Sequence, residues 1–290
     1  MRKRTAGTVA VLGATGKTGR YLVARLCERG YDVAAIGRDR ARLEALDERA
    51  RPVVADLEAP ATVKAALAGA ERVASLAHAR HAQALIDALP AGCARVVVTG
   101  STRRFTRLPD PAAEAVRAGE AAFARAGLPG VMLHPSMIYG APDDRNVNRL
   151  LRLVRARRVI PLPDGGRHRV QPVFVDDVVE AYVAALERET APGPPIVIAG
   201  PEPITYAAMV RACAEALDRR VAIVPLPAGA LIAAARVARA LGIALPFDAD
   251  EIRRATEDKV FDPGEMRERL GVSPRPFAEG LRLKCARGWC

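Results

Sequence analysis

The chain has 290 residues, of which 50% are hydrophobic and 4% aromatic, and its formal net charge is +11. Its arginines do not form a run interleaved with aromatic residues, so we expect no nucleic-acid partner. Arg236 and Arg239 interrupt the longest apolar stretch, 228–247, which excludes a transmembrane span of roughly 20 apolar residues. We expect this stretch to form an amphipathic helix packed against the protein, with membrane-surface binding as the alternative.

Apolar runs and helical spacing alternate regularly over the first 140 residues. We expect strands at 8–12, 32–36, 51–54, 71–76, 95–99 and 131–134. Helices are expected between them at 17–29, from 39, and at 61–68, 79–89 and 112–126. This order predicts an α/β protein with a Rossmann-type, doubly wound parallel sheet.

Beyond residue 140 proline and glycine become frequent and the alternation loosens. We expect helices near 145–157, 176–188, 205–217, 227–241 and 248–257, with short strands at 170–174, 195–199 and 221–225. The sequence therefore predicts a dinucleotide-binding domain over 1–200, in which a segment near 141–172 belongs to a second lobe. Residues 201–290 are expected to form that small, mostly helical, substrate lobe.

The five cysteines are dispersed and have no CxxC spacing with histidine partners. We therefore expect no zinc site and no other metal, and we interpret Cys285 and Cys290 as a chance pair. The basic segment 1–4 is expected to be a solvated tail, because no signal-peptide apolar region follows it. Together these features predict a reduced, cytoplasmic chain, either a monomer or a homodimer.

A glycine-rich turn joins the first expected strand to the first expected helix. The sequence there is Gly13, Ala14, Thr15, Gly16, Lys17, Thr18 and Gly19. Gly13 permits a sharp turn, Gly16 permits close approach of a pyrophosphate, and Gly19 permits close packing of the helix. The unpaired N–H groups and the dipole of a helix N-terminus favour an anion. The turn predicts a nicotinamide dinucleotide site that includes Thr15, Lys17 and Thr18.

The end of the second strand distinguishes NADP from NAD. An acidic residue there would bind the ribose hydroxyls, whereas an arginine would bind a 2′-phosphate. Arg38 occupies this position and Asp39 follows it as a candidate helix cap. We expect NADP, with NAD as the alternative.

Two further strand ends face the same edge of the expected sheet. Asp56 and Leu57 follow the third strand, where the carboxylate could reach the adenine or cap the next helix. Ala77 and His78 follow the fourth strand, where small residues let a dinucleotide cross the sheet edge. We expect all four residues to line the cofactor site.

At this point the sequence resembles the extended and atypical short-chain dehydrogenases/reductases. It is most similar to the NAD-dependent epimerase/dehydratase group and to relatives of the respiratory complex I accessory subunit. The resemblance covers about 200 residues and rests on 13–19, 56–57, 99–102, 133–140 and 171–178. It implies that Thr99 and Pro135 contact the cofactor and that Ser101 and Thr102 belong to the catalytic group.

The family's catalytic Tyr-x-x-x-Lys pair is missing. An acidic residue four positions after the lysine matches Glu120, which places Ala112 and Val116 at the tyrosine and lysine positions. Because proton transfer typically contributes about 10²–10⁴-fold to the rate, another group must act or turnover is absent. His134 is the candidate acid/base. A strand-end histidine bonded to the backbone is the alternative.

Cationic and amide residues beyond this point suit an anionic small-molecule substrate. The candidates for substrate binding are Arg103, Arg145, Asn146, Arg169 and Gln171. We expect an NAD(P)-dependent oxidoreductase or epimerase acting on a small anionic or nucleotide-linked carbonyl or sugar. The alternative is a non-catalytic NADP(H)-binding redox sensor or accessory protein.

Overall fold

The computed structural model describes residues 6–188, 193–243, 245 and 247–290, so the expected tail at 1–4 lies outside the described residues. The chain divides into two compact units, each built from three segments. The first unit comprises Met1–Ser136, Val175–Ile198 and Pro263–Ser273. The second comprises Met137–Phe174, Ala199–Asp262 and Pro274–Cys290. The first two segments of the second unit begin at 137 and 199, close to the expected 141 and 201, whereas 263–273, expected in the second lobe, belongs to the first unit.

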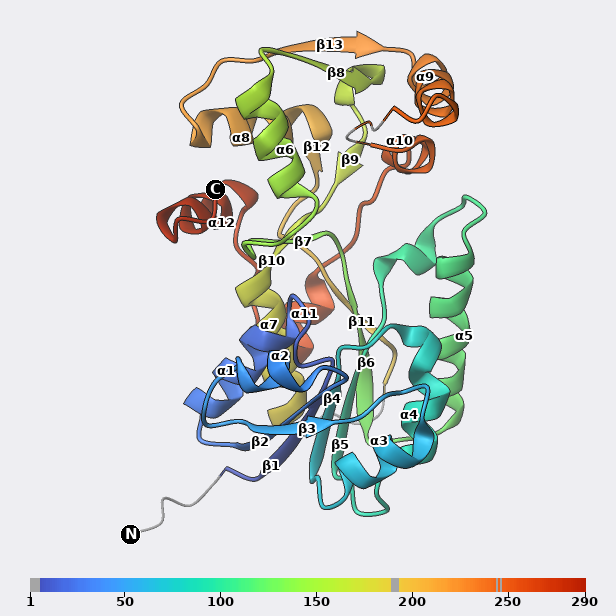
Figure 1. Cartoon of the computed structure of the whole chain (residues 1–290), viewed down its shortest axis with the longest axis vertical. Coiled ribbons are helices and arrows are strands. Elements are labelled where there is room, and N and C mark those ends of the chain that lie inside the picture. Colours follow the sequence, from blue (N-terminus) through green and yellow to red (C-terminus); the bar gives the residue numbers. More distant parts are fainter. Residues whose placement is uncertain (1–5, 189–192, 244, 246) are drawn as a thin grey trace. The chain divides into compact units, whose positions relative to one another are not determined.

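The first unit is built around a seven-stranded parallel sheet in the order β11-β6-β5-β4-β1-β2-β3 (Figure 1). Its strands are β1 (Thr8–Leu12), β2 (Asp32–Gly37), β3 (Arg51–Val54), β4 (Arg72–Ser75), β5 (Arg95–Thr99), β6 (Gly130–Pro135) and β11 (Ile196–Ile198). The central strands carry Val, Ile, Leu and Ala on both faces, as strands covered on both sides require. The order reverses beside β1, which creates a crevice at the carboxyl ends of β1 and β4.

Helices cover both faces of this sheet (Figure 1). One face is covered by α1 (Gly19–Glu28), α7 (Val175–Glu187) and α11 (Gly264–Leu270). The other is covered by α3 (Pro60–Leu67), η1 (Ala79–His81), α4 (Ala82–Ala88) and α5 (Pro111–Arg125). Two short helices, α2 (Arg40–Glu44) and η2 (Thr102–Phe105), follow β2 and β5. The predicted α/β fold is confirmed.

The second unit combines helices with two-stranded sheets around its own apolar core. The pairs are β7 (Ile138–Tyr139) with β10 (Val173–Phe174), β8 (Val159–Pro163) with β13 (Ala222–Leu226), and β9 (Arg169–Val170) with β12 (Ile204–Thr205). Its helices are α6 (Val147–Ala156), η3 (Asp164–Gly166), α8 (Tyr206–Ala216), α9 (Ala228–Ala240), α10 (Ala249–Ala255) and α12 (Phe277–Ala286). No described helix is both long and apolar enough to span a bilayer.

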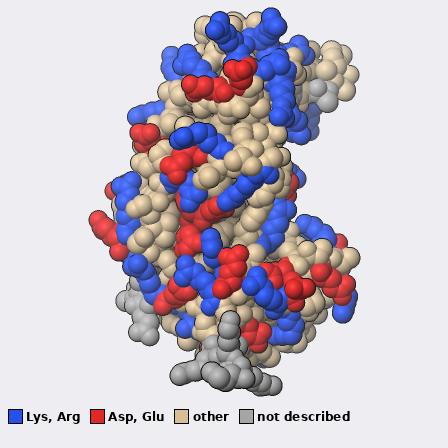
Figure 2. Space-filling model, turned by 90° about the vertical axis from the view of Figure 1, so that its left-hand side faces the viewer, with Lys and Arg blue, Asp and Glu red and all other residues tan. Residues whose placement is uncertain are grey.

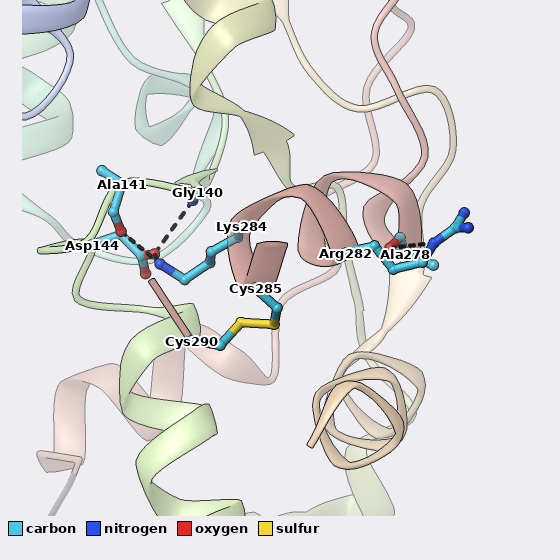
Figure 3. Close-up of a disulfide and its surroundings, with 8 residues drawn as sticks. All are labelled: Gly140, Ala141, Asp144, Ala278, Arg282, Lys284, Cys285 and Cys290. Carbon is cyan, nitrogen blue, oxygen red and sulfur yellow. Dashed lines mark hydrogen bonds and ion pairs between the residues drawn. A yellow bond between two sulfur atoms is a disulfide. The ribbon is translucent and has the colours of Figure 1, made fainter. Parts of the chain in front are cut away.

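The C-terminal helix corrects one expectation. Cys285 and Cys290 form a disulfide (Figure 3). After α12 the chain turns at Gly288, whose φ is +72°, and Trp289 N–H donates to Lys284 O, which returns Cys290 to Cys285. The expectation of a fully reduced chain with a chance pair is therefore wrong at these two positions. The other three cysteines are free.

Candidate cofactor and active site

The glycine turn fits closely between β1 and the loop after β4. Gly13 has a φ of +75°, and a Cβ built there would lie 3.2 Å from the carbonyl carbon of Leu76. A Cβ on Gly19 would lie 2.2 Å from Gly13 O, so only glycine fits at this position. The N–H groups of Gly13 and Ala14 donate to Ile36 O and fix the turn against β2.

The start of α1 is open to an anion. Thr18 is the N-cap, and its side chain makes no capping hydrogen bond. Gly16 is exposed between Thr15 and the exposed Lys17. A Cβ on Gly16 would lie 3.0 Å from Gly13 O. Gly16, Arg20 and Tyr21 already donate their N–H groups to Gly13 O, Gly16 O and Thr18 O, so an anion would bind this helix N-terminus through other N–H groups of the turn. The glycine backbone and the helix N-terminus have the chemistry to bind a pyrophosphate.

The tip of β2 carries two arginines. Arg38 is exposed and makes no ion pair with any described residue. Asp39 caps α2 by accepting from Arg42 N–H at 3.1 Å. Arg42 Nη2 donates to Thr15 O at 2.9 Å and so reaches the glycine turn itself. The sequence interpretation missed Arg42, whose contact with Thr15 O joins residues 27 positions apart.

Polar side chains in the loops after β3 and β4 accept hydrogen bonds from backbone N–H groups two residues further along the chain. One carboxylate oxygen of Asp56 accepts from Glu58 N–H at 3.1 Å, whereas Ala59 is the N-cap of α3. Leu57 packs against the apolar core. His78, which follows Ala77, accepts from Arg80 N–H at 3.1 Å and begins η1. Burial lowers the pKa of His78, so its ring is neutral near pH 7.

Three hydroxyl groups lie at the end of β5. Thr99 Oγ1 donates to Ser75 O at 2.7 Å and lies 2.5 Å from the buried Tyr182 hydroxyl. Ser101 Oγ accepts from Arg103 N–H at 3.1 Å and is half-buried. Thr102 Oγ1 donates to Pro135 O at 3.3 Å and links this loop to the end of β6. Of these three hydroxyl groups, Thr99 and Thr102 donate to backbone oxygens, whereas Ser101 accepts a hydrogen bond and keeps its own proton available.

His134 is buried, with 1% of its surface exposed. Its Nδ1 accepts from Ser101 N–H at 2.8 Å, and its Nε2 lies 3.1 Å from Glu120 Oε2. Arg104 Nε lies 2.5 Å from the same oxygen, although neither short contact has hydrogen-bond angles. Burial, assisted by the Arg104 charge, lowers the pKa of His134 to about 4. These contacts favour the backbone-bonded interpretation over a titrating acid/base.

Glu120 and Gly100 complete this buried cluster. Burial raises the pKa of Glu120, and the Arg104 charge opposes that shift. A Cβ on Gly100 would lie 2.2 Å from His134 Nδ1, so glycine is required for the imidazole to reach the Ser101 N–H. The structure thus gives His134 the function of holding the loop that carries Ser101.

The positions expected for the catalytic pair, Ala112 and Val116, lie on α5 and carry no titratable group. Val116 is 2% exposed and belongs to the packed core. Ala112 is half-buried, and its N–H donates to Asp110 Oδ1 at 2.9 Å. Arg103 Nε lies 2.5 Å from the other oxygen of Asp110, which ties this candidate substrate residue to the start of α5.

The remaining candidate substrate residues lie in the second unit, where two are bonded to other residues of the unit and two are exposed. Gln171 is 1% exposed, donates to Gly200 O at 2.7 Å and accepts from Phe261 N–H at 2.8 Å. Arg169 binds Asp258 through two nitrogens at 3.1 and 3.0 Å. These two residues therefore hold loops of the second unit together, and their expected contacts with a substrate stay predictions. Arg145 and Asn146 are exposed at the start of α6.

No group of three or more His, Cys, Asp or Glu among the described residues could hold a metal ion. The site is instead a phosphate cradle, two arginines and a serine hydroxyl along one sheet edge. These are the features of a dinucleotide-binding protein.

Comparison with known proteins identifies the class. Residues 13–149 match the NAD(P)H-binding family, and residues 113–200 match the NAD dependent epimerase/dehydratase family. A Streptomyces 3-diazoavenalumate denitrifying reductase is 31% identical over 62% of this chain and 72% of that protein. The chain belongs to the NAD(P)-binding proteins of the epimerase/dehydratase family, as the resemblance predicted.

Other relatives cover more of the chain at lower identity. The ceramide reductase of Caulobacter vibrioides is 26% identical over 96% of this chain and 90% of that protein. A mitochondrial NADH dehydrogenase [ubiquinone] subunit of Arabidopsis thaliana is 26% identical over 92% and 74% of the two chains. By contrast, the chain spans only 23% of the length of mycobacterial relatives that are 31% identical to it.

The fold is also that of known epimerase structures. UDP-glucose 4-epimerase from Thermotoga maritima, solved with UDP-glucose, has a TM-score of 0.75 at 19% identity and covers 96% of this chain and 97% of its own. At this identity the likeness establishes the fold alone.

Proposed function

We propose that the chain binds NADP(H) at the carboxyl edge of the first unit's sheet and reduces or epimerises a small carbonyl or sugar substrate. The observation that carries the proposal is the turn at 13–19, where three closely fitted glycines precede an uncapped helix. Bound there, a reduced nicotinamide would supply a hydride. Two relatives named as reductases support this reaction type.

Arg38 and Arg42 support the phosphorylated dinucleotide. Arg38 is exposed at the tip of β2, and Arg42 contacts the glycine turn through Thr15 O. The family's acidic residue for the ribose hydroxyls is absent from this tip, where Gly37 precedes Arg38. A guanidinium binds a 2′-phosphate with two parallel hydrogen bonds. NAD remains the alternative cofactor.

Ser101 is the proposed proton donor. Its hydroxyl lies at the end of β5, accepts from Arg103 N–H and retains its own proton. In a reduction, hydride would add to the substrate carbon while the Ser101 hydroxyl donates a proton to the oxygen and regains one from water. The neutral His134 keeps the Ser101 backbone in place, and the Thr102 hydroxyl ties the loop to Pro135.

The proposed substrate is anionic. Arg145 and Asn146 remain the candidates for its recognition because their side chains are exposed at the start of α6. Arg103 is 41% exposed at its side chain, so it could contact substrate while paired with Asp110. Neither Arg169 nor Gln171 is part of this proposal.

A non-catalytic cofactor-binding protein is the second candidate function. Ala112 and Val116 replace the catalytic pair, and Val116 is sealed in the core. Such a protein would sense the redox state of the dinucleotide or serve as an accessory subunit.

Cofactor binding is tested first, by titrating the purified chain with NADPH and NADH in a calorimeter. Arg38→Ala should weaken NADPH binding by about tenfold or more, the value of one charged hydrogen-bonded contact, and leave NADH binding nearly unchanged. Arg40→Ala is the matched control, because Arg40 is exposed on α2 and pairs with Glu44. Equal losses for both dinucleotides with Arg38→Ala would contradict the NADP assignment.

Turnover is tested next, by following NADPH oxidation with a panel of carbonyl and sugar-nucleotide substrates. Ser101→Ala should lower kcat by about 10²-fold or more without changing NADPH affinity, whereas Ser273→Ala, an exposed serine of the same unit, should not. Tight NADPH binding without turnover across the panel would favour the sensor. Unchanged kcat in Ser101→Ala would remove Ser101 from the mechanism.

A further inference from the structure

Exposed apolar side chains concentrate in the second unit. Of the nine large hydrophobic residues that are most exposed in the described chain, seven belong to this unit. Four of them lie close together in the sequence, at the end of α9 and just after it: Val237 (59% exposed), Leu241 (69%), Ile243 (55%) and Leu245 (48%). This concentration separates them from the isolated exposed residues found on any surface.

Helix α9 is apolar on two opposite sides. Its single buried residue is Ala235, on the side that packs against the protein. Val237 and Leu241 are four positions apart and therefore share the outer side with Ala230 and Ala234. The sequence predicts an amphipathic helix packed on the protein, but that packing accounts for only the inner side.

The neighbouring strands extend this surface. Val159 of β8 is 54% exposed and Val224 of β13 is 38% exposed. The two strands pair in register, with Ala222 opposite Val159. Figure 1 shows α9 following β13 and lying beside α10, with which it is in contact. We call the exposed residues of β8, β13 and α9, together with 241, 243 and 245, the basic apolar face.

The charge of this face is positive. Residues 145–163 include six arginines, residues 219–247 include four, and neither segment contains an acidic residue. The pairing of β8 with β13 brings these two segments together. Figure 2, which views the molecule from the left-hand side of Figure 1 and not from the side of α9, shows Lys and Arg together with a short row of Asp and Glu in its upper part. The unit has 20 Lys and Arg against 13 Asp and Glu, a net +7 of the chain's +11.

The positive charge and the apolar side chains of this face together favour one kind of binding partner over the others. A second copy of the chain would bring the same arginines against each other in a two-fold interface, which is unfavourable. Nucleic acid would neutralise the arginines but leave aliphatic side chains such as Leu241 and Ile243 without a partner. An anionic bilayer accommodates both, with aliphatic groups entering the interface and guanidinium groups reaching the lipid phosphates.

We propose that the basic apolar face docks on the surface of an anionic lipid bilayer. Helix α9 lies in the plane of the interface, with Val237, Leu241, Ile243 and Leu245 inserted. Arg236 flanks the inserted side, whereas Arg239, four positions after Ala235, lies toward the inner side and acts through its charge. The helix is too short to span the membrane, so the association is peripheral and reversible. This inference does not depend on the proposed cofactor or reaction.

The test is flotation of the full chain with vesicles of two compositions. One is phosphatidylcholine alone, and the other is phosphatidylcholine with phosphatidylglycerol at about two to one, which supplies an anionic surface. The chain should bind the anionic vesicles at low salt, bind the neutral vesicles at least tenfold more weakly, and lose affinity as salt rises. Failure to bind the anionic vesicles would overturn the proposal.

Two variants locate the binding surface. Arg236→Glu/Arg239→Glu should reduce binding to anionic vesicles at least tenfold, and Leu241→Ser/Ile243→Ser should reduce it severalfold. Arg125→Glu/Arg267→Glu, two exposed arginines of the first unit, makes the same change in net charge and should have a much smaller effect. Val260→Ser controls for loss of an exposed apolar residue elsewhere in the second unit.

Other occupants give different results. If the control pair lowers binding as much as the α9 pair, attraction is set by total charge and the docking face is wrong. If the wild-type chain is a dimer in light scattering and Leu241→Ser/Ile243→Ser is a monomer, a second copy covers the face and the proposal is overturned. Circular dichroism of each variant checks that these exposed substitutions leave the fold intact.

Discussion

Replacing Asp144 by asparagine should strongly destabilise the second unit. Lys284 Nζ lies 3.2 Å from Asp144 Oδ2 and donates to Ala141 O at 2.7 Å (Figure 3). The two side chains are 0% and 5% exposed, so neither charge is hydrated. Oδ1 of Asp144 also accepts from the N–H groups of Val147 and Asn148 at the start of α6.

The magnitude follows from the ammonium group that the substitution leaves behind. An asparagine oxygen can still accept from the two N–H groups, so the helix cap is retained. Lys284 would keep its bond to Ala141 O but lose its counter-charge, and breaking a buried ion pair in this way costs about 3–5 kcal/mol. Replacing both partners, as in Asp144→Asn/Lys284→Met, should recover at least half of that loss because no charge stays buried.

Urea unfolding followed by circular dichroism measures the effect. Glu202→Gln is the control, since Glu202 is an exposed acidic residue of the same unit, and its free energy of unfolding should stay within about 0.5 kcal/mol of wild type. A loss below about 1 kcal/mol for Asp144→Asn, or a double variant as unstable as the sum of the single variants, would refute the reasoning.

Three other predictions concern the first unit and the cysteines. Gly19→Ala should weaken NADPH binding at least about tenfold, because its Cβ would lie 2.2 Å from Gly13 O; Gly92→Ala, where a Cβ meets open space, should not. Because the pKa of folded His134 is about 4, below its ordinary value of 6.5, stability should be constant above pH 6.5 and fall by up to about 3 kcal/mol as the pH drops to about 4. Glu120, whose pKa is raised, has the opposite effect and reduces the slope of unfolding free energy against pH. His134→Gln should flatten this slope when urea unfolding is measured at a series of pH values. An unchanged slope would assign the pH dependence to other groups. Thiol titration of the unfolded chain should count three reactive cysteines before reduction and five after it; five before reduction would mean that Cys285 and Cys290 are not bonded.

The parallel sheet could be predicted from the sequence because its signals are local. Strands β1, β3 and β5 begin and end at the predicted residues, since each is a short apolar run that stops where polar or glycine residues begin. Strand β8 was missed because Pro161 and Pro163 suggest a loop, and its pairing with β13 joins residues about 60 positions apart. Helix α12 was also missed. Glycine is required at its position 280 because a Cβ there would lie 2.1 Å from the hydroxyl of Tyr139, a contact that sequence spacing does not reveal.

The candidate site shows the same division between local and tertiary signals. The glycine turn and Arg38 could be found from position alone, because strand ends of a parallel sheet meet at one edge. The state of His134 could not, because its low pKa arises from burial and from the charge of Arg104, which comes from η2. Gln171 and Arg169 likewise have polar side chains suited to a ligand, but these side chains donate hydrogen bonds to Gly200 and Asp258, far along the chain.

Because each unit is built from three separate segments, the division of the chain affects the order in which the units can fold and where the chain can be truncated. Strand β11, at one edge of the seven-stranded sheet, and helix α7, which buries nine residues against the first unit, both follow the first segment of the second unit. Helix α11 comes later still, at 264–270. On the ribosome, the sheet that holds the glycine turn therefore cannot be completed until residue 198 has emerged, and the helix α11 that covers it follows only at 264–270. A fragment ending at residue 136 would keep α1 but lack α7 and α11 on that face of the sheet and β11 at its edge, so we expect a minimal first unit to need the three segments rejoined by new connections.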